Sequence, residues 1–334
     1  MSGKGRFLVT GAAGFVGSTL VDRLLADGRE VVGLDSFDPF YPEEQKQQNL
    51  AAAMQSPAFQ LVRGDIRDAQ AVEGLFAGGD VAGVVHLAAL AGVRPSLERP
   101  AEYADVNVRG TAVVLEAAAR HAAPPVVLAS SSSVYGERED GPFRESDSVE
   151  RPVSPYAATK RACELVAHTF HHAHGLRVTC ARIFTAYGPR QRPDLAIRKF
   201  AERMLRDEPI PVYGDGSSLR DFTYVDDLVE GLVQALDTDT GFRILNFGAG
   251  RKVSVLEVVK ALERELATQA RIEWLPTQTG DVPRTWADIS AAREALGYAP
   301  QVDFEEGIAR FARWVVTRWD EEGGSGALAR GRSS

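Results

Sequence analysis

A glycine-rich turn near the start of this 334-residue chain most strongly constrains its fold. Residues 6–10 form a short β-branched run, and residues 11–17 read GAAGFVG before apolar residues begin to recur at helical spacing. A second apolar run, residues 30–34, ends in Asp35. Strand, glycine turn, helix and second strand together predict a first βαβ unit, in which two parallel strands are joined by a helix.

The position of this turn indicates a dinucleotide site. Glycines let the backbone approach a pyrophosphate, which lies on the positive end of the helix, while Asp35 can accept a hydrogen bond from a ribose hydroxyl. A carboxylate there repels a 2′-phosphate, so NAD is favoured over NADP. A glycine turn without a ligand is the alternative, and the acid at the strand end argues against it. The predicted cofactor-binding residues of this unit are Gly11, Gly14, Phe15, Val16, Gly17 and Asp35.

The rest of the chain continues to alternate strands with helices. This pattern predicts an α/β fold, a Rossmann-like doubly wound parallel sheet. The further predicted strands are residues 59–63, 83–86, 126–130, 177–182 and 243–246, and the predicted helices are residues 107–121, 156–174, 226–237, 253–266 and 304–319. Residues 36–49 are expected to form a long loop that could cover the cofactor or the substrate.

Proline and glycine become frequent after Arg182, which predicts a second, smaller substrate-binding subdomain. We expect an NAD-binding domain of residues 1–183 that is rejoined by residues 221–250. The predicted subdomain comprises residues 184–220 and 251–320, and residues 321–334, rich in Gly, Ser and Arg, form a loose tail.

Two further strand ends could contribute to the cofactor site. Asp65 and Ile66 follow the third predicted strand, where the carboxylate can accept a hydrogen bond from an adenine amino group and the apolar side chain can pack on the ring. A simple cap of the strand end is the alternative for Asp65. The fourth predicted strand is followed by Leu87, Ala88 and Ala89, a run that suits close approach of the cofactor.

Composition and charge argue against several classes of function. A net charge of −8 with interspersed signs argues against binding to nucleic acid or to an anionic membrane. The two cysteines lack paired or metal-like spacing, the chain enters its first strand without a signal peptide, and no apolar stretch approaches about 18 residues, so we expect a cytoplasmic protein. We expect His171, His172 and His174 to lie on a solvated helix end without a metal, and His86 to be structural.

A serine run and a Tyr-x-x-x-Lys motif carry the predicted chemistry. Tyr156 and Lys160 lie four residues apart on one face of a predicted helix, where the lysine charge can stabilise the phenolate. Residues 130–133 are all serine, and one of their hydroxyls could complete a proton-transfer site. Such a motif is usually a packed tyrosine beside a solvated lysine. Here the motif follows a dinucleotide-binding pattern in the sequence, and this context favours a catalytic role instead.

With these motifs the chain resembles the extended short-chain dehydrogenases/reductases, the family of NAD-dependent nucleotide-sugar epimerases and dehydratases, over about residues 6–319. Within the family it most resembles the UDP-glucuronate 4-epimerases. The resemblance rests on residues 34–41 (LDSFDPFY), 86–96 (HLAALAGVRPS), 187–194 (YGPRQRPD), 214–227 (GDGSSLRDFTYVDD) and 280–283 (GDVP).

The resemblance implies a role for each site residue. The catalytic hydroxyl is Ser131, the base is Tyr156, and Lys160 binds the nicotinamide ribose. Arg220 matches the arginine that holds the UDP diphosphate, whereas Gln278 replaces a second diphosphate arginine of related hexose epimerases. The implied substrate-binding residues are Arg94, Ser132, Ser133, Thr185, Arg192, Val212, Tyr213, Arg220 and Asp281.

The implied reaction is 4-epimerisation of UDP-glucuronate to UDP-galacturonate through a transient 4-keto intermediate. Family dehydratases carry an Asp-Glu pair, and decarboxylases a Glu, where this chain has Ser132 and Ser133, so these hydroxyls favour epimerisation and can bond a substrate carboxylate. The alternatives are a UDP-glucose or UDP-N-acetylglucosamine 4-epimerase, a dehydratase or decarboxylase, and an NAD-binding protein without catalysis. A homodimer through residues 107–121 and 156–174 is also implied.

Overall fold

The computed structural model describes residues 5–78, 81–138, 141–277 and 282–323. Its centre is a sheet of seven parallel strands in the order β11-β6-β5-β4-β1-β2-β3. These strands are β1 (Arg6–Thr10), β2 (Glu30–Asp35), β3 (Phe59–Arg63), β4 (Val81–His86), β5 (Val126–Ser131), β6 (Val178–Ile183) and β11 (Phe242–Phe247). The doubly wound parallel sheet predicted from the sequence is confirmed, and its strand order reverses between β1 and β4.

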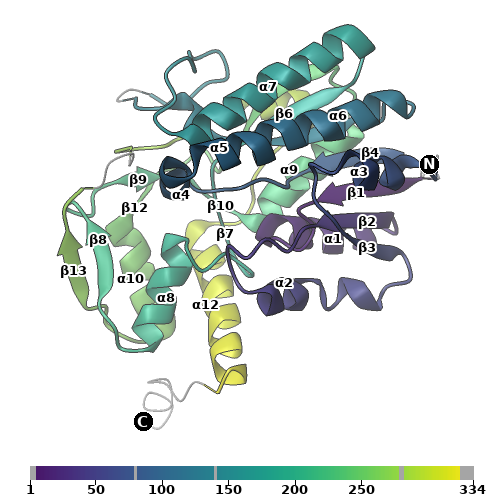
Figure 1. The fold of residues 1–334 in the computed structure, drawn as a ribbon. Coiled ribbons are helices and arrows are strands. Elements are labelled where there is room, and N and C mark those ends of the chain that lie inside the picture. Colours follow the sequence, from purple (N-terminus) through teal and green to yellow (C-terminus); the bar gives the residue numbers. More distant parts are fainter. Residues whose placement is uncertain (1–4, 79–80, 139–140, 278–281, 324–334) are drawn as a thin grey trace.

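Helices cover both faces of this sheet (Figure 1). One face packs against α3 (Ala69–Phe76), α6 (Gly110–Arg120) and α7 (Pro155–His174), and the other against α1 (Phe15–Ala26), α9 (Val225–Asp237) and α11 (Ser290–Leu296). A parallel sheet needs both covers, because its strands expose apolar side chains on both faces. In β4, for example, the neighbours Val84 and Val85 point to opposite faces and both are fully buried.

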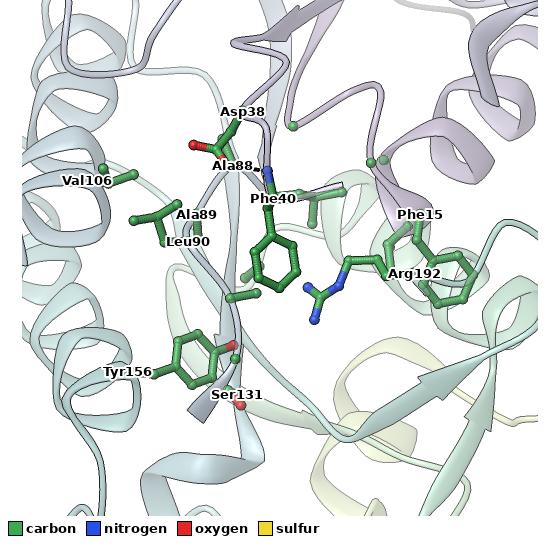
Figure 2. Close-up of a pocket in the computed structure, with 18 of the residues that line it drawn as sticks. Phe15, Asp38, Phe40, Ala88, Ala89, Leu90, Val106, Ser131, Tyr156 and Arg192 are labelled. Atoms are coloured by element: carbon green, nitrogen blue, oxygen red, sulfur yellow. Dashed lines mark hydrogen bonds between the residues drawn. The ribbon is translucent and has the colours of Figure 1, made fainter. Parts of the chain in front are cut away.

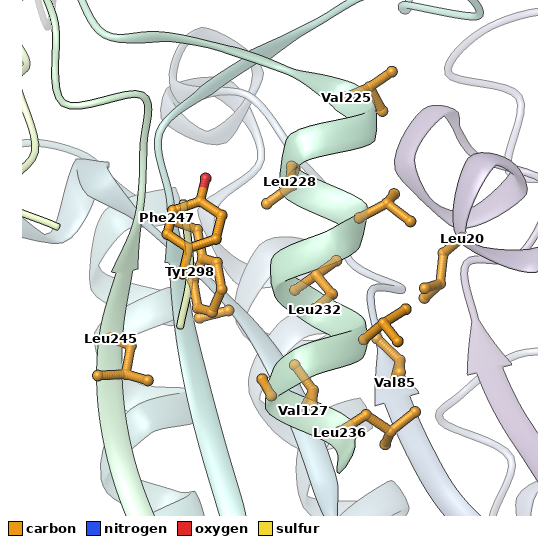
Figure 3. Packing of buried hydrophobic residues seen from close by; sticks show 14 of the residues in the cluster. Leu20, Val85, Val127, Val225, Leu228, Leu232, Leu236, Leu245, Phe247 and Tyr298 are labelled. Atoms are coloured by element: carbon orange, nitrogen blue, oxygen red, sulfur yellow. The ribbon is translucent and has the colours of Figure 1, made fainter. Parts of the chain in front are cut away.

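Helix α9 supplies much of the core on its face of the sheet. Figure 3 shows Leu228, Leu232 and Leu236 along α9, facing Val85 of β4 and Val127 of β5. The three leucines are four residues apart, so they form one stripe of the helix, and all five side chains are buried. Residues 225–237 therefore return to the sheet after the chain has left it beyond β6.

A smaller lobe has a hydrophobic core of its own, built mainly from three helices. They are α8 (Ala196–Leu205), α10 (Val255–Leu266) and α12 (Phe304–Glu321). Three short strand pairs accompany them, namely β7 (Thr185–Tyr187) with β10 (Phe222–Tyr224), β8 (Ile210–Tyr213) with β13 (Ile272–Leu275), and β9 (Leu219–Arg220) with β12 (Val253–Ser254). The domain limits given above stay a prediction, and residues 324–334 of the predicted tail lie outside the described residues.

Short helical segments complete the connections. They are α2 (Glu43–Leu50), α4 (Val93–Glu98), α5 (Pro100–Tyr103), the 3₁₀ turns η1 (Ala53–Gln55) and η3 (Ser132–Tyr135), and the π-helical turn η2 (Ala104–Arg109). Within the part of the chain that the structure describes, none of the helices combines the length and the apolar character that crossing a bilayer requires.

Two predicted elements differ from the structure. Residues 36–49, predicted as a loop, contain α2, whose sequence EEQKQQNL has almost no apolar periodicity because polar contacts hold it. Asn49, for example, donates from Nδ2 to the Ala13 carbonyl oxygen at 3.1 Å. Residues 107–121, predicted as one helix, begin within η2 and continue as α6. The wide π turn places Asn107 inside the protein, where the side chain binds the backbone of Leu90.

We expect the substitution Leu232→Ala to destabilise the protein by about 2–5 kcal/mol, because it leaves a cavity where α9 meets the sheet. Leu232 is fully buried, whereas Leu97 is 46% exposed, so Leu97→Ala is the matched control. Denaturant unfolding followed by circular dichroism measures both variants. Equal midpoints for the two would contradict this account of the core.

Candidate active site

A large cavity lies at the carboxyl ends of the parallel strands, where the strand order reverses. Its lining comes from the loops after β1, β2, β3, β4 and β5, from α7, and from residues 183–195 next to the smaller lobe. Ligands of doubly wound proteins bind at this edge, because neighbouring loops diverge there and leave a crevice between them.

The glycine turn forms one wall of the cavity. Gly11 has φ +71°, and a Cβ there would lie 2.8 Å from the Ala88 nitrogen, so the turn fits tightly against the loop after β4. A Cβ on Gly17 would lie 2.0 Å from the Gly11 oxygen. Gly14 precedes α1 and no side chain caps the helix, so its first N–H groups are available to an anion. Phe15 and Val16 of this first turn also line the cavity.

Two acids lie where the sequence predicts the ribose and the adenine to bind. Asp35 ends β2, and its two carboxylate oxygens accept from Ala13 N at 2.9 Å and from Phe37 N at 2.8 Å. These bonds fix the carboxylate and leave lone pairs for a ribose hydroxyl. Asp65 is held by Arg67, which donates from Nη2 at 2.6 Å and from Nε at 3.0 Å, and this pairing lowers the pKa of Asp65.

The remaining predicted cofactor residues line the same wall. They are Ile66, Leu87, Ala88 and Ala89, and Figure 2 labels the two alanines among the residues that line the cavity. The lining therefore contains every residue that the sequence assigned to the cofactor. A dinucleotide fits the chemistry of this wall, because it offers free helix N–H groups, an acid for the ribose and small or apolar side chains between them.

Helix α7 brings the predicted catalytic residues to the opposite wall. Its first residues read Ser154-Pro155, a side-chain cap followed by proline, and Ala157 N donates to Ser154 Oγ at 3.1 Å. Figure 2 shows the Tyr156 ring close to Ser131, which ends β5. Lys160 lies one turn further along the helix, and its Nζ donates to the Ala129 oxygen at 2.8 Å.

The serine run turns sharply after β5. Ser131 Oγ donates to Ser133 Oγ at 3.2 Å, and Ser133 N donates back to Ser131 Oγ at 3.1 Å. Ser131, Ser132 and Ser133 all line the cavity. The turn thus places three neutral hydroxyls beside Tyr156, with no acid among them.

The predicted substrate residues fall into two groups. Thr185 and Arg192 line the cavity together with the serines. Arg192 donates to both carboxylate oxygens of Asp194, from Nε at 3.0 Å and from Nη2 at 2.9 Å. Its guanidinium also lies 5.4 Å from the centre of the Phe40 ring. Figure 2 shows Arg192 beside Phe40. A cation therefore lines the part of the cavity where the sugar is predicted to bind, although Asp194 already neutralises part of its charge.

The other group lies outside the cavity lining. Arg94 lies over the Tyr213 ring at 5.0 Å, the Val212 side chain is buried in the core of the smaller lobe, and Arg220 bonds the Leu219 oxygen at 2.9 Å. Asp281 lies outside the described residues, as does Gln278. The roles that the resemblance implies for these residues stay predictions.

The structure adds residues that the sequence reasoning missed. Asp38, Phe40, Tyr41 and Lys46 line the cavity from the segment predicted only as a covering loop. Lys46 is buried, donates to the Asp38 oxygen at 2.7 Å and lies 4.8 Å from the centre of the Tyr41 ring, and burial lowers its pKa. The clustered aromatic residues of this segment were the available signal, because exposed loops seldom carry so many.

His86 and Asn107 have structural roles. The His86 ring nitrogens lie 2.7 Å from Thr10 Oγ1 and 3.0 Å from Thr111 Oγ1, and burial lowers the pKa of His86 to about 3, so the ring is neutral. Asn107 accepts from Leu90 N and donates to Leu90 O, which clamps the loop after β4. The described residues contain no group of three His, Cys, Asp or Glu side chains that could hold a metal ion.

Comparisons with known proteins agree with this geometry. Residues 8–311 match the family model described as GDP-mannose 4,6 dehydratase. A UDP-glucuronate 4-epimerase of Thermodesulfobacterium geofontis is 40% identical over 93% of this chain and 96% of its own. A probable UDP-glucuronate 4-epimerase of Rhizobium meliloti is 39% identical over 92% of this chain and 96% of its own.

Solved structures show the same likeness. A UDP-glucuronic acid 4-epimerase of Bacillus cereus, crystallised with UDP-glucuronic acid and NAD, matches with a TM-score of 0.89 and 35% identity, covering 94% of this chain and 99% of that one. The dTDP-glucose 4,6-dehydratase DesIV of Streptomyces venezuelae, with NAD bound, matches with a TM-score of 0.88 and 33% identity, covering 95% and 98%.

We expect Gly17→Ala to abolish retention of a bound dinucleotide, because the new Cβ meets backbone that cannot rotate away. Gly74→Ala is the matched control, since a Cβ at Gly74 of α3 meets nothing within 4 Å. Nucleotide released from each purified protein by denaturation measures the effect. Full retention by Gly17→Ala would remove the glycine turn from the cofactor site.

Proposed function

Because this chain belongs to the extended short-chain dehydrogenase/reductase family, the family of the matching GDP-mannose 4,6 dehydratase model, we propose that it interconverts UDP-glucuronate and UDP-galacturonate using bound NAD. One observation carries the proposal. Tyr156, Ser131 and Lys160 line the same cavity as a wall whose chemistry fits a dinucleotide, and the serine turn beside them carries no acid. The identity to UDP-glucuronate 4-epimerases over nearly the whole chain supports the choice of substrate.

The residues of the chain divide the chemistry between them. When bound, NAD⁺ supplies reversible acceptance of hydride from C4 of the sugar. Tyr156 as phenolate takes the proton from the C4 hydroxyl, and Ser131 holds the same oxygen by a hydrogen bond. Lys160, whose Nζ donates to the Ala129 carbonyl oxygen, lies one helical turn from Tyr156 and is proposed to bind the nicotinamide ribose. The same groups return the proton once the sugar has presented its other face.

Rotation of the 4-keto sugar between these two steps requires a tether. The nucleotide part of the substrate is remote from C4, so its binding energy can hold the intermediate in the protein while the ring turns. Arg220 is proposed to bind the diphosphate, and Arg94 and Tyr213 to lie along the same part of the substrate. Their place outside the cavity lining requires the substrate to extend from the cavity toward the smaller lobe.

The neutral serines are proposed to protect the intermediate. A 4-keto uronate is a β-keto acid, and it loses CO₂ when its C5–C6 bond aligns with the carbonyl π system. Hydrogen bonds from Ser132, Ser133 and Thr185 to the substrate carboxylate would hold that bond out of alignment. Acids at these positions would repel the carboxylate, and they would supply the protons that elimination of water requires.

A neutral UDP-sugar is the second candidate substrate. MoeE5, 38% identical with TM-scores of 0.82 and 0.81 to this chain, was crystallised with UDP-glucose and with UDP-glucuronic acid, so a related cavity accepts both. Arg192 can favour the anionic sugar over the neutral one only through the part of its positive charge that Asp194 does not neutralise.

Incubation of purified protein with UDP-glucuronate and, separately, with UDP-glucose tests the function. We expect UDP-galacturonate from the first without added reductant, and we expect Tyr156→Phe to lower its rate by about 10²–10⁴-fold because the proton acceptor is lost. Tyr298→Phe is the matched control, because it removes a buried hydroxyl bonded to Gly248 O at 3.0 Å, away from the cavity. Mainly UDP-pentose among the products, or an active Tyr156→Phe variant, would overturn the proposal.

We further propose a homodimer formed by α6 and α7 of each subunit. Leu165 on the surface of α7 is 52% exposed, which suits an apolar contact between copies. Light scattering should give twice the chain mass at micromolar concentration, and a monomer would contradict the dimer.

We also propose a cytoplasmic location. Cys163 and Cys180 are buried free thiols, as a reducing compartment permits. Recovery of the protein from a secreted fraction would contradict this location.

A further inference from the structure

Helix α7 carries a third polar side chain on the face that holds Tyr156 and Lys160. Glu164 follows Lys160 by four residues, so the three side chains stand in a row along the helix. Tyr156 faces the cavity, while Lys160 and Glu164 reach the last residues of β5. Ser130 Oγ donates to Glu164 Oε1 at 2.6 Å. Two side chains thus join α7 to the strand end that leads into the serine turn.

Four hydrogen bonds hold the Glu164 carboxylate. Oε1 accepts from Arg182 Nε at 2.8 Å as well as from Ser130, and Oε2 accepts from Arg182 Nη2 at 2.9 Å and from Arg161 Nη1 at 3.0 Å. Arg182 lies on β6 directly opposite Ser130 of β5. Burial alone would raise the pKa of Glu164, but the bonds and charge of Arg182 outweigh burial and keep that pKa below its usual range.

The same pair also contacts the far end of the serine turn. The Arg182 guanidinium lies 4.8 Å from the centre of the Tyr135 ring, and Tyr135 is the last residue of η3. Tyr135 Oη donates to Asn246 Oδ1 at 2.6 Å, which anchors the ring to β11. Ser130 and Tyr135, which flank the serines from 131 to 133, therefore both contact the buried Glu164–Arg182 ion pair.

A gain in the stability of the folded protein does not explain well why Glu164 and Arg182 form a buried ion pair. Glu164 and Arg182 are each 1% exposed, and removing two charges from water costs about as much as their attraction returns, so a well-packed apolar pair is often as stable or more so. Neither residue lines the cavity and both side chains are buried, so neither is accessible to a substrate. What an ion pair adds over apolar packing is direction, because each oxygen and each N–H fixes the angle of its partner.

We propose that Glu164 and Arg182 are positioning residues that set the serine turn against Tyr156 through Ser130 and Tyr135. This proposal rests on the proposed function, because its consequence is the fate of the 4-keto intermediate. A turn held in one place keeps Ser131 on the C4 oxygen and keeps the next two hydroxyls on the carboxylate. A loosened turn lets the carboxylate rotate, and more of the intermediate loses CO₂.

Ser130→Ala tests the proposal with the smallest possible change, since the hydroxyl is lost and the ion pair stays. A displacement of about 1 Å near a reacting centre can cost up to about 100-fold, so we expect kcat to fall by about tenfold or more. KM for UDP-glucuronate should stay within about twofold of the wild-type value, because the tether by the nucleotide is untouched. The share of UDP-pentose among the products should rise.

Thr179→Val is the matched control. Thr179 lies on the neighbouring strand β6, is buried, and forms a hydroxyl bond of 2.9 Å with Thr240 at the far end of the strand. This variant loses a partly buried hydrogen bond between two hydroxyls without touching the serine turn. Both variants should stay folded at the assay temperature, and Thr179→Val should keep the kcat and the product ratio of the wild type. Wild-type values for Ser130→Ala, or equal losses in both variants, would overturn the proposal.

A further measurement separates this proposal from the proposed function. If the wild-type protein does not epimerise UDP-glucuronate, the proposed function fails. The rise of reduced nicotinamide absorbance in a single turnover, with whichever UDP-sugar the protein oxidises, still reports how Ser131 and Tyr156 meet the sugar. Slower reduction in Ser130→Ala than in Thr179→Val would then support the positioning role, and equal rates would contradict it.

Discussion

The reversal of strand order between β1 and β4 is the constraint on which the rest of the structure depends. Crossovers on opposite faces make the loops after these two strands diverge, and the space between them is the cavity. The turn that fills one side must be glycine, because a Cβ on Gly11 would lie only 2.8 Å from the backbone of the loop after β4. Helix α7 reaches the other side because it follows β5, the next strand outward.

The sequence predicted the sheet well because each strand is a local run of buried apolar residues with a turn at its end. The seven predicted strands agree with β1 to β6 and β11 to within about two residues. Helix α2 was missed because its stability comes from tertiary polar contacts such as Asn49 to Ala13, which leave no apolar period. The π turn η2 was missed for a related reason, since Asn107 binds the backbone of Leu90, a residue remote in sequence.

The candidate site divides in the same way. The cofactor wall depends on spacing within one βαβ unit and on residues directly after strands, so local patterns could indicate it. The side proposed to bind the substrate depends on how the smaller lobe meets the sheet, and no local sequence pattern contains that information. Phe40 and Arg192 come from lining segments that are remote in sequence, and only the structure shows their contact. Position alone also could not show that Val212 points into a hydrophobic core.

The serine turn combines a neutral surface with a charged support. Ser131 to Ser133 offer only hydroxyls to the cavity, yet the carboxylate of Glu164 lies directly behind Ser130. Arg182 and Arg161 neutralise that carboxylate, and the Ser130 hydroxyl donates to it. An acid is thus present next to the turn, but it is paired with these three side chains and does not line the cavity. This separation lets a charge fix the turn in place while the surface that meets an anionic sugar stays free of negative charge.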